Sequence, residues 1–353
     1  MSGSLHRPLT ALLAMLVTAS CAAAAAGAQP ATTVVQAGGE MVTVEREVAY
    51  GMPGDSTRVL DVWRPAEPAP GHPGLVIVHG GAWAGGTRAE ESERATLAAS
   101  QGWTVFNIDY PTTAVLGTTG GAWPTEVDAV RQALGWTVTN ADRYGVDRNH
   151  LAMVGMSAGG HLAALAAADG TSGVRALAVW SAPTDLAALA SDGSGAPPGC
   201  AGNTQCEQVW SMPLVEEFLG CLPSQCPQRY RAASALEQVT QATPPTFIAN
   251  ADNELVPLSQ ARSLHDALVR HGVDVKLHTV RGSAHASAYT SAVWNEMMPF
   301  LASHLGVPEP EPIDFSERDH RAVVIASLAV AVVLAMLAGV VVLRGRTRIG
   351  GRR

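Results

Sequence analysis

Aromatic residues are scarce in this sequence, at 5% of 353 residues, whereas alanine and glycine are abundant. The core is therefore expected to consist mainly of alanine, valine and leucine. Basic residues are also in deficit, because 23 Lys and Arg stand against 31 Asp and Glu and give a formal net charge of −8. Such an acidic chain lacks the positive surface that binds phosphate backbones, which argues against a nucleic-acid-binding protein.

Cysteine is rare as well, and its distribution is uneven. Four of the five cysteines lie within 27 residues: Cys200, Cys206, Cys221 and Cys226. Their intervals of six, fifteen and five residues differ from the C-x₂-C pairs typical of metal sites. In an exported chain two disulfides are expected instead, and of the three possible pairings we prefer the two local ones. No metal site is predicted.

The first 28 residues have the pattern of a secretory signal peptide. Arg7 precedes an apolar run from Leu9 to Ala19, and Ala26-Gly27-Ala28 resembles a cleavage site. Cys21 raises the alternative of a lipoprotein, although the position three residues before it is Thr18, where such signals prefer leucine. We expect a signal peptide at 1–28 and a mature chain that starts near Gln29.

The other end of the chain has the pattern of a membrane anchor. Residues 322–343 carry no charge and as a helix would span about 33 Å, enough to cross a bilayer core. The basic segment 344–353 follows, and positive residues stay cytoplasmic. A Pro- and Glu-rich stalk is expected at 308–321. The predicted location is the cell membrane, with one span and an extracellular catalytic domain; a buried core helix is the alternative for 322–343.

Residues 29–307 alternate between strand-like and helix-like patterns. The continuous apolar runs at 74–81, 103–110 and 174–183 suit buried strands, and helical patterns lie between them. Strands alternating with helices predict an α/β fold with a mostly parallel sheet and helices on both faces. The Cys-, Pro- and Gly-rich segment 191–231 interrupts this pattern and is expected to form an insertion, or lid, that covers the site.

The stretch GMSAGG places Ser157 between a predicted strand and a predicted helix. In this context G-x-S-x-G is a nucleophile elbow, in which glycines permit a tight turn that exposes the serine hydroxyl. A simple loop of small residues is the structural alternative. We expect Ser157 to be the nucleophile.

A serine hydroxyl needs a base to remove its proton. His285 follows the last predicted strand, where the chain order serine, acid, histidine places the base. The acid is expected in the loop after the strand PTFIAN, where two carboxylates compete. Asp252 is the preferred acid and Glu254 its rival, and either would orient the imidazole and stabilise its charged form.

Backbone N–H groups are needed to stabilise the oxyanion of the tetrahedral intermediate. His79-Gly80-Gly81-Ala82-Trp83 closes a predicted buried strand, and small residues there let the backbone approach a substrate. We expect the N–H groups of Gly81, Ala82 and Ala158 to form the oxyanion hole. A tight glycine turn without this role is the alternative.

HGGAW, GMSAGG, a loop acid and a late histidine, in this order, resemble the α/β-hydrolase superfamily over about residues 42–305. The similarity is greatest to its carboxylesterase branch, the hormone-sensitive-lipase and feruloyl-esterase-like proteins with an HGG-type oxyanion loop. Relatives usually read D-x-x-V-P at the acid, and here Asn253 occupies that aspartate position. The acid must therefore be supplied by a neighbour of Asn253.

These features predict an exported, membrane-anchored serine hydrolase that cleaves small-molecule carboxylic esters through an acyl-serine intermediate. The chemistry requires no cofactor and no metal. Two alternatives stay open. One is an exopeptidase or amidase of the same fold, and the other is an inactive cell-surface binding domain.

Overall fold

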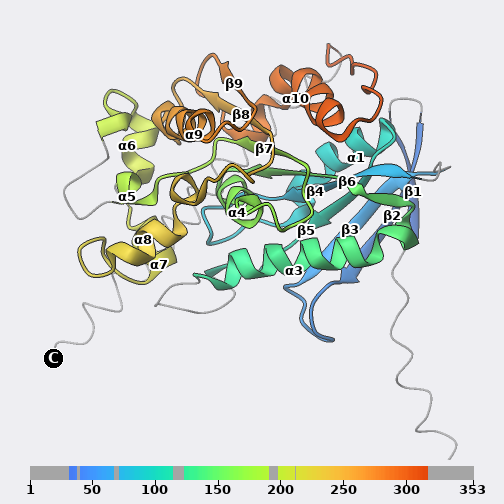
Figure 1. Ribbon diagram of the computed structural model, residues 1–353, viewed down its shortest axis with the longest axis horizontal. Helices are drawn as coiled ribbons and strands as arrows, with labels where there is room; N and C mark the ends of the chain where they lie inside the picture. The colour runs from blue at the N-terminus through green and yellow to red at the C-terminus, as the bar shows by residue number, and fades with distance from the viewer. Residues whose placement is uncertain are drawn as a thin grey trace, which may run out of the picture.

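A single mixed sheet forms the centre of the protein in this computed structural model (Figure 1). The structure describes residues 32–37, 40–66, 71–113, 123–190, 198–210 and 212–316. Its nine strands are β1 (Thr32–Ala37), β2 (Glu40–Ala49), β3 (Val59–Pro65), β4 (His72–Val78), β5 (Thr104–Ile108), β6 (Val146–Met156), β7 (Ala176–Trp180), β8 (Thr246–Ala251) and β9 (Val275–Val280). They lie in the order β1-β2-β3-β5-β4-β6-β7-β8-β9.

The two halves of the sheet differ in strand direction. Along the run β5-β4-β6-β7-β8-β9 every neighbouring pair is parallel. Along the run β1-β2-β3-β5 every neighbouring pair is antiparallel. The inner parallel strands such as β5, β7 and β8 are buried on both faces, which explains their largely apolar sequences, whereas the edge strand β9 is only partly buried. The alternation of strands and helices is confirmed. Five of the eight neighbouring pairs are parallel, as expected for a mostly parallel sheet, and the three antiparallel pairs make the sheet a mixed one.

Helices cover both faces of the sheet (Figure 1). The α-helices are α1 (Ser92–Ser100), α3 (Thr125–Asn140), α4 (Ala158–Ala167), α5 (Leu186–Leu189), α6 (Thr204–Trp210), α7 (Leu214–Leu219), α8 (Pro227–Ala233), α9 (Leu258–Arg270) and α10 (Thr290–Leu305). Short 3₁₀ turns are η1 (Arg88–Glu91), η2 (Ala141–Tyr144), η3 (Pro198–Cys200), η4 (Ala235–Gln238) and η5 (Ala286–Tyr289).

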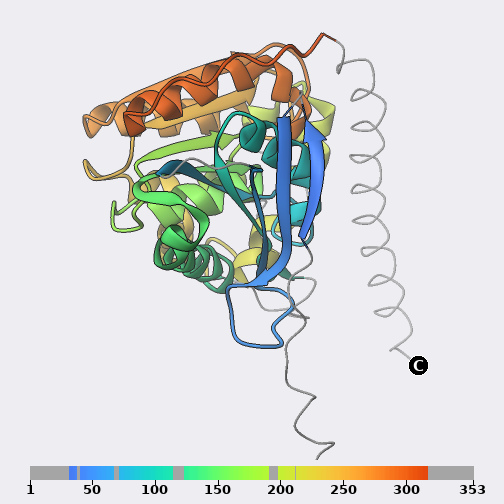
Figure 2. The same cartoon turned by 90° about the vertical axis from the view of Figure 1, so that its right-hand side faces the viewer.

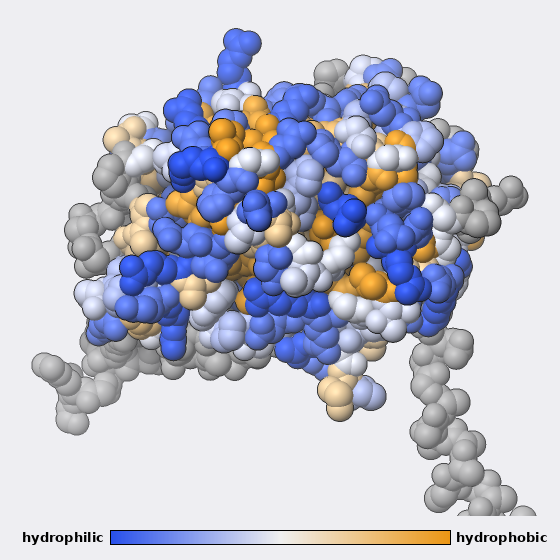
Figure 3. All heavy atoms as spheres, in the orientation of Figure 1, coloured by the Kyte–Doolittle hydropathy of each residue, from blue (hydrophilic) through white to orange (hydrophobic). Residues whose placement is uncertain are grey.

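Alternate side chains of each central strand enter two separate apolar cores. In β4, Leu75 and Ile77 pack with α1 and α10, whereas Val76 and Val78 pack with α3, α4 and α9. This is the two-residue period of a strand with both faces buried. On the face seen in Figure 3, apolar side chains lie in separate patches between polar ones.

The insertion joins one of these cores instead of forming its own. Buried residues of α6, α7 and α8 belong to the same apolar cluster as α3, α4 and α9. Disulfides join Cys200 to Cys206 and Cys221 to Cys226, the two local pairings that the sequence favoured.

The described part of the predicted stalk packs against the domain. The segment after α10 runs beside that helix (Figure 2), and Asn295 exchanges two hydrogen bonds with the backbone of Ile313, at 2.8 and 2.9 Å. Ile313 and Phe315 contact the core beneath α1 and α10. Up to residue 316 the segment is therefore docked, although its Pro- and Glu-rich composition predicted a solvated spacer.

No helix within the described residues has the length and apolarity needed to cross a membrane. The predicted span at 322–343 lies outside those residues, as do the predicted signal peptide at 1–28 and the basic tail at 344–353. The described residues form an α/β-hydrolase-like mixed sheet with helices, and the fold class is corrected to this because a C-terminal transmembrane helix is not supported.

A buried carboxyl group at the start of α3 makes stability depend on pH. Glu126 is fully buried, and neither carboxyl oxygen has a hydrogen-bond partner of good geometry among the described residues. Burial raises the pKa of Glu126 to about 9. The native state keeps this proton while the unfolded chain releases it near its ordinary pKa of 4.5. Unfolding therefore releases a proton between these values, and this contribution to stability declines as pH rises from about 4.5 to 9.

We expect Glu126→Gln, a neutral near-isostere, to remove this dependence. The melting temperature of the variant should match that of the wild type near pH 5 and exceed it increasingly up to pH 9. Asp128→Asn, on an exposed side chain of the same helix, is the control and should leave the pH dependence unchanged. Parallel melting-temperature curves for Glu126→Gln and the wild type would contradict the buried-acid interpretation.

Candidate functional site

Ser157 lies in a strained turn between β6 and α4. Its φ of 54° and ψ of −123° fall outside the regions that side chains other than glycine usually adopt. The flanking glycines are required by space, because a Cβ on Gly159 would lie 2.2 Å from the carbonyl oxygen of His79, and one on Gly155 would lie 2.3 Å from that of Gly159. The Ser157 side chain is partly exposed. The predicted elbow therefore has the geometry that its sequence indicated.

The loop after β4 lies directly beside this turn. A Cβ on Gly80 would lie 3.1 Å from the Cβ of Ser157. Gly81, Ala82 and Trp83 all have positive φ, at 124°, 52° and 59°. Ala158 is the first residue of α4, where helical N–H groups have no partner within the helix. The three predicted oxyanion residues thus belong to the two backbone segments that meet at Ser157.

Two buried histidines hold the loop after β4. The Trp83 indole donates a hydrogen bond to Nδ1 of His161 at 3.0 Å, and Nε2 of His161 donates to the carbonyl of Ala233 at 2.7 Å. Burial lowers the pKa of His161 to about 4, so its ring stays neutral and can accept from Trp83. The ring of Trp83 also stacks on Phe218 of the insertion, with centroids 4.8 Å apart.

The second histidine, His79, stacks on Tyr110 with ring centroids 4.3 Å apart. The Tyr110 hydroxyl donates to the His79 carbonyl at 2.9 Å, and Nδ1 of His79 lies 2.7 Å from the carbonyl oxygen of Gly80. Burial lowers the pKa of His79, which keeps the ring neutral. Because a carbonyl only accepts, the single ring proton lies on Nδ1 and is donated to Gly80. These contacts order the backbone of the loop.

Glu254, rather than Asp252, contacts His285. Nδ1 of His285 pairs with Oε2 of Glu254, whose side chain is fully buried. The other carboxylate oxygen, Oε1, accepts hydrogen bonds from the Ala251 N–H at 2.8 Å and the Ser181 hydroxyl at 2.7 Å. Asp252 is exposed and accepts from the Gly282 N–H at 2.9 Å. This contact favours the rival Glu254 over Asp252 as the acid, because the loop after β8 turns the carboxylate of Glu254 inward and that of Asp252 outward.

Strand order brings these loops together. Ser157, Ser181, Glu254 and His285 follow the carboxyl ends of β6, β7, β8 and β9, which are neighbours in the sheet. Met156 is in register with Trp180, so Ser157 and Ser181 follow paired positions, and the Ser157 N–H bonds the Trp180 carbonyl at 2.7 Å. The loop after β9 reaches back to this point, because the Ala286 N–H donates to the Ser181 hydroxyl at 2.9 Å.

The insertion contacts the loop that carries the acid. Asn203 donates to the carbonyl of Glu254 at 2.8 Å, and the Trp210 indole donates to the carbonyl of Leu255 at 2.5 Å. Asn203 lies inside the small ring closed by the Cys200–Cys206 disulfide. The sequence does not point to Asn203, Trp210 or Ser181, because no local pattern marks side chains that contact a distant loop.

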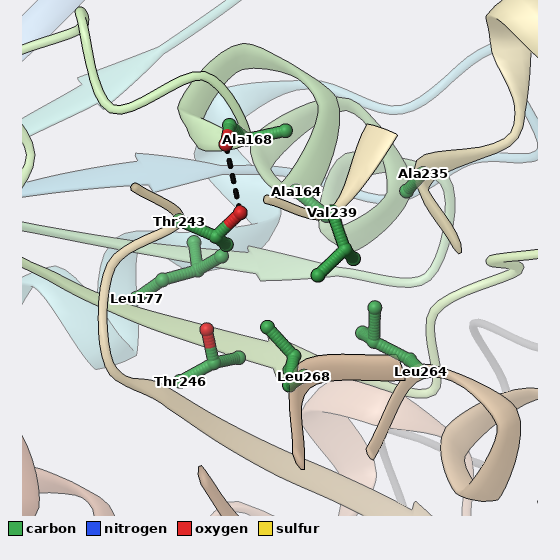
Figure 4. A pocket seen from close by; sticks show the side chains of 9 residues that line it. All are labelled: Ala164, Ala168, Leu177, Ala235, Val239, Thr243, Thr246, Leu264 and Leu268. Atoms are coloured by element: carbon green, nitrogen blue, oxygen red, sulfur yellow. Dashed lines mark hydrogen bonds between the residues drawn. The ribbon is translucent and has the colours of Figure 1, made fainter. Parts of the chain in front are cut away.

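No group of three or more His, Cys, Asp or Glu side chains within the described ranges is placed to hold a metal ion. A small pocket lies between α4, α9 and the sheet (Figure 4). Its lining is apolar apart from two threonines, and it adjoins the last turn of α4, whereas Ser157 precedes the first. This pocket therefore carries none of the groups described above.

Comparisons with known proteins agree with this geometry. A family model described as BD-FAE matches residues 60–268. Esterase LipC of Mycobacterium tuberculosis is 34% identical over 240 residues, which cover 63% of this chain and 54% of that protein. Esterase LipQ of the same organism is 30% identical over 248 residues, covering 68% and 56%. The chain thus spans about half the length of the curated relatives it matches.

Among solved structures, a truncated carbohydrate esterase from gut microbiota superposes with a TM-score of 0.60. It is 20% identical in sequence, and the match covers 79% of this chain and 99% of the other. At that identity the likeness concerns the fold. Together with the family match, it confirms the resemblance to α/β-hydrolase carboxylesterases that the sequence motifs suggested.

Proposed function

This chain belongs to the BD-FAE family, and from that premise we propose that it is a serine carboxylesterase. The observation that carries the proposal is the strained turn at Ser157 beside the positive-φ loop 81–83, with the His285–Glu254 pair anchored to Ser181 at the end of the neighbouring strand β7. The esterases of Mycobacterium tuberculosis named above support an ester as the substrate.

In the proposed mechanism the Ser157 oxygen attacks the carbonyl carbon of the ester. Because Nδ1 of His285 faces Glu254, its Nε2 is the nitrogen that takes the serine proton. The buried carboxylate of Glu254 holds this tautomer and stabilises the imidazolium. The oxyanion accepts hydrogen bonds from the N–H groups of Gly81, Ala82 and Ala158, as their position beside the turn permits.

Collapse of the tetrahedral intermediate breaks the bond to the alcohol oxygen, which takes the proton from His285 and leaves. Water then attacks the acyl-serine while His285 accepts one of its protons. The second intermediate collapses, His285 returns the proton to Ser157, and the carboxylic acid is released. All proton transfers run through one imidazole, and the residues named supply every group that the reaction needs.

We expect the protein to hydrolyse p-nitrophenyl acetate and to be labelled by a fluorophosphonate probe at Ser157. Ser157→Ala should lose both, because the probe and the ester require the same nucleophile. An aminoacyl-nitroanilide is the control substrate. Cleavage of the anilide alone would indicate an exopeptidase or amidase, and a folded protein that takes no label would indicate a binding domain.

The acid assignment predicts unequal effects of two neighbouring carboxylates. Glu254→Gln should reduce kcat/KM for p-nitrophenyl acetate by about 10³- to 10⁴-fold, because an amide favours the wrong imidazole tautomer. Asp252→Asn is the matched control and should retain kcat/KM within about threefold. A larger loss in Asp252→Asn than in Glu254→Gln would overturn the assignment.

We further propose that the catalytic domain is exported. The signal-like pattern at 1–28 supports this, as do the two disulfides, since disulfides persist in oxidising compartments. Protein taken from its own cells with thiols blocked at lysis should yield the peptides Cys200–Cys206 and Cys221–Cys226 in linked form. Blocked, unlinked thiols at all four cysteines would contradict export.

A further inference from the structure

Ser181 occupies a strained and fully buried position directly after β7. Its φ is 50°, in the left-handed region that residues other than glycine rarely adopt. Such strain persists only where the surrounding structure compensates for it. We propose that Ser181 is a positioning residue of the esterase, whose hydroxyl fixes the Glu254 carboxylate and ties the His285 loop to it. The proposal rests on the proposed function.

The direction of each hydrogen bond of Ser181 follows from which of its partners can donate a proton and which can only accept one. Its oxygen lies 2.7 Å from Oε1 of Glu254, 2.9 Å from the Ala286 nitrogen and 2.7 Å from the Tyr289 oxygen. An ionised carboxylate only accepts, so the single Ser181 proton points at Glu254. The Ala286 N–H donates to the serine oxygen. Ser181 thus links the acid to the residue that follows the base.

Tyr289 forms a further hydrogen bond with the Ser181 hydroxyl. Burial raises the pKa of Tyr289 well above its ordinary value, so its hydroxyl keeps its proton. Since the Ser181 proton is directed at Glu254, Tyr289 shares its own proton between the serine oxygen and the carbonyl of Ala249, which lies 3.0 Å away. The chain of donors therefore runs from Tyr289 and Ala286 through Ser181 to Glu254, whose other oxygen accepts from Nδ1 of His285.

The sheet explains why a serine is needed at this point. The loop carrying His285 begins after β9, which lies three strands from β6, the strand that precedes Ser157. Neighbouring strands are about 4.8 Å apart. The loop must therefore return across roughly 14 Å. The hydrogen bond from Ala286 to Ser181, which follows β7 beside β6, holds the loop where it has returned toward Ser157. Ala286 itself has a φ of 47°, so the loop is bent where it is held.

The experiment measures kcat and KM for p-nitrophenyl acetate in Ser181→Ala and Ser181→Gly. Both remove the hydroxyl, and glycine also relieves the strain at positive φ. We expect kcat to fall about 10- to 100-fold in both, with KM within about twofold, because a small displacement of the base impairs chemistry more than binding. Ser181→Gly should keep a higher melting temperature than Ser181→Ala, which separates the loss of activity from any loss of stability.

A double-mutant cycle tests whether Ser181 acts through the acid. In a Glu254→Gln background, Ser181→Ala should reduce kcat by less than about threefold, because residues that act as a unit are not additive. Thr243→Val is the matched control. The Thr243 hydroxyl is buried like that of Ser181, but it donates to the backbone carbonyl of Ala168, at 2.7 Å, and lies at the amino end of the parallel strands (Figure 4). This variant should lower the melting temperature and leave kcat unchanged.

The outcomes are distinct. Retention of kcat in both Ser181 variants, while Glu254→Gln loses activity, would overturn the positioning role and leave the proposed function intact. Equal losses in the two backgrounds would also overturn it, because Ser181 would then act independently of Glu254. Full activity in both Ser157→Ala and Glu254→Gln would refute the proposed function and with it this inference.

Discussion

The site depends on one close approach between two backbone segments. The first turn of α4 lies against the end of β4 so closely that a Cβ on Gly159 would lie 2.2 Å from the carbonyl oxygen of His79. Only glycine permits this contact. It brings the loop 81–83 beside Ser157 and the start of α4. The proposed nucleophile and the proposed oxyanion hole thus depend on a single steric constraint.

The order of the strands in the sheet determines which loops lie around this contact. Parallel strands bring all their carboxyl ends to one edge, so loops far apart in the sequence become neighbours in the order of the strands. The insertion contacts one of these loops through two hydrogen bonds to the backbone carbonyls of Glu254 and Leu255. Its disulfide at Cys200–Cys206 restrains the residues that make the first of these bonds.

Some of the few aromatic residues fill the two cores, such as Phe106 and Trp294, whereas others hold loops in place. Trp83 connects the strained loop to His161 and stacks on Phe218 of the insertion, and Tyr110 supports the backbone at His79. A ring with one polar atom suits this role, because it combines a large buried area with a directed hydrogen bond. The aliphatic core expected from composition supplies the bulk of the packing.

The sequence by itself determined the features that depend on neighbouring residues. The turn at Ser157 follows from glycine spacing, the buried parallel strands follow from continuous apolar runs, and both disulfides join cysteines five or six residues apart. The antiparallel strands at one side of the sheet were not predicted, because strand pairing joins segments that are distant in the chain.

Tertiary structure alone decided between the carboxylates of Asp252 and Glu254, which lie two residues apart in one loop. Composition and spacing cannot tell which of them points inward, because that depends on the path of the loop after β8. Ser181 shows the same limit more strongly. Its role follows from hydrogen bonds to residues 73 and 105 positions away, and no local pattern encodes a contact over that separation.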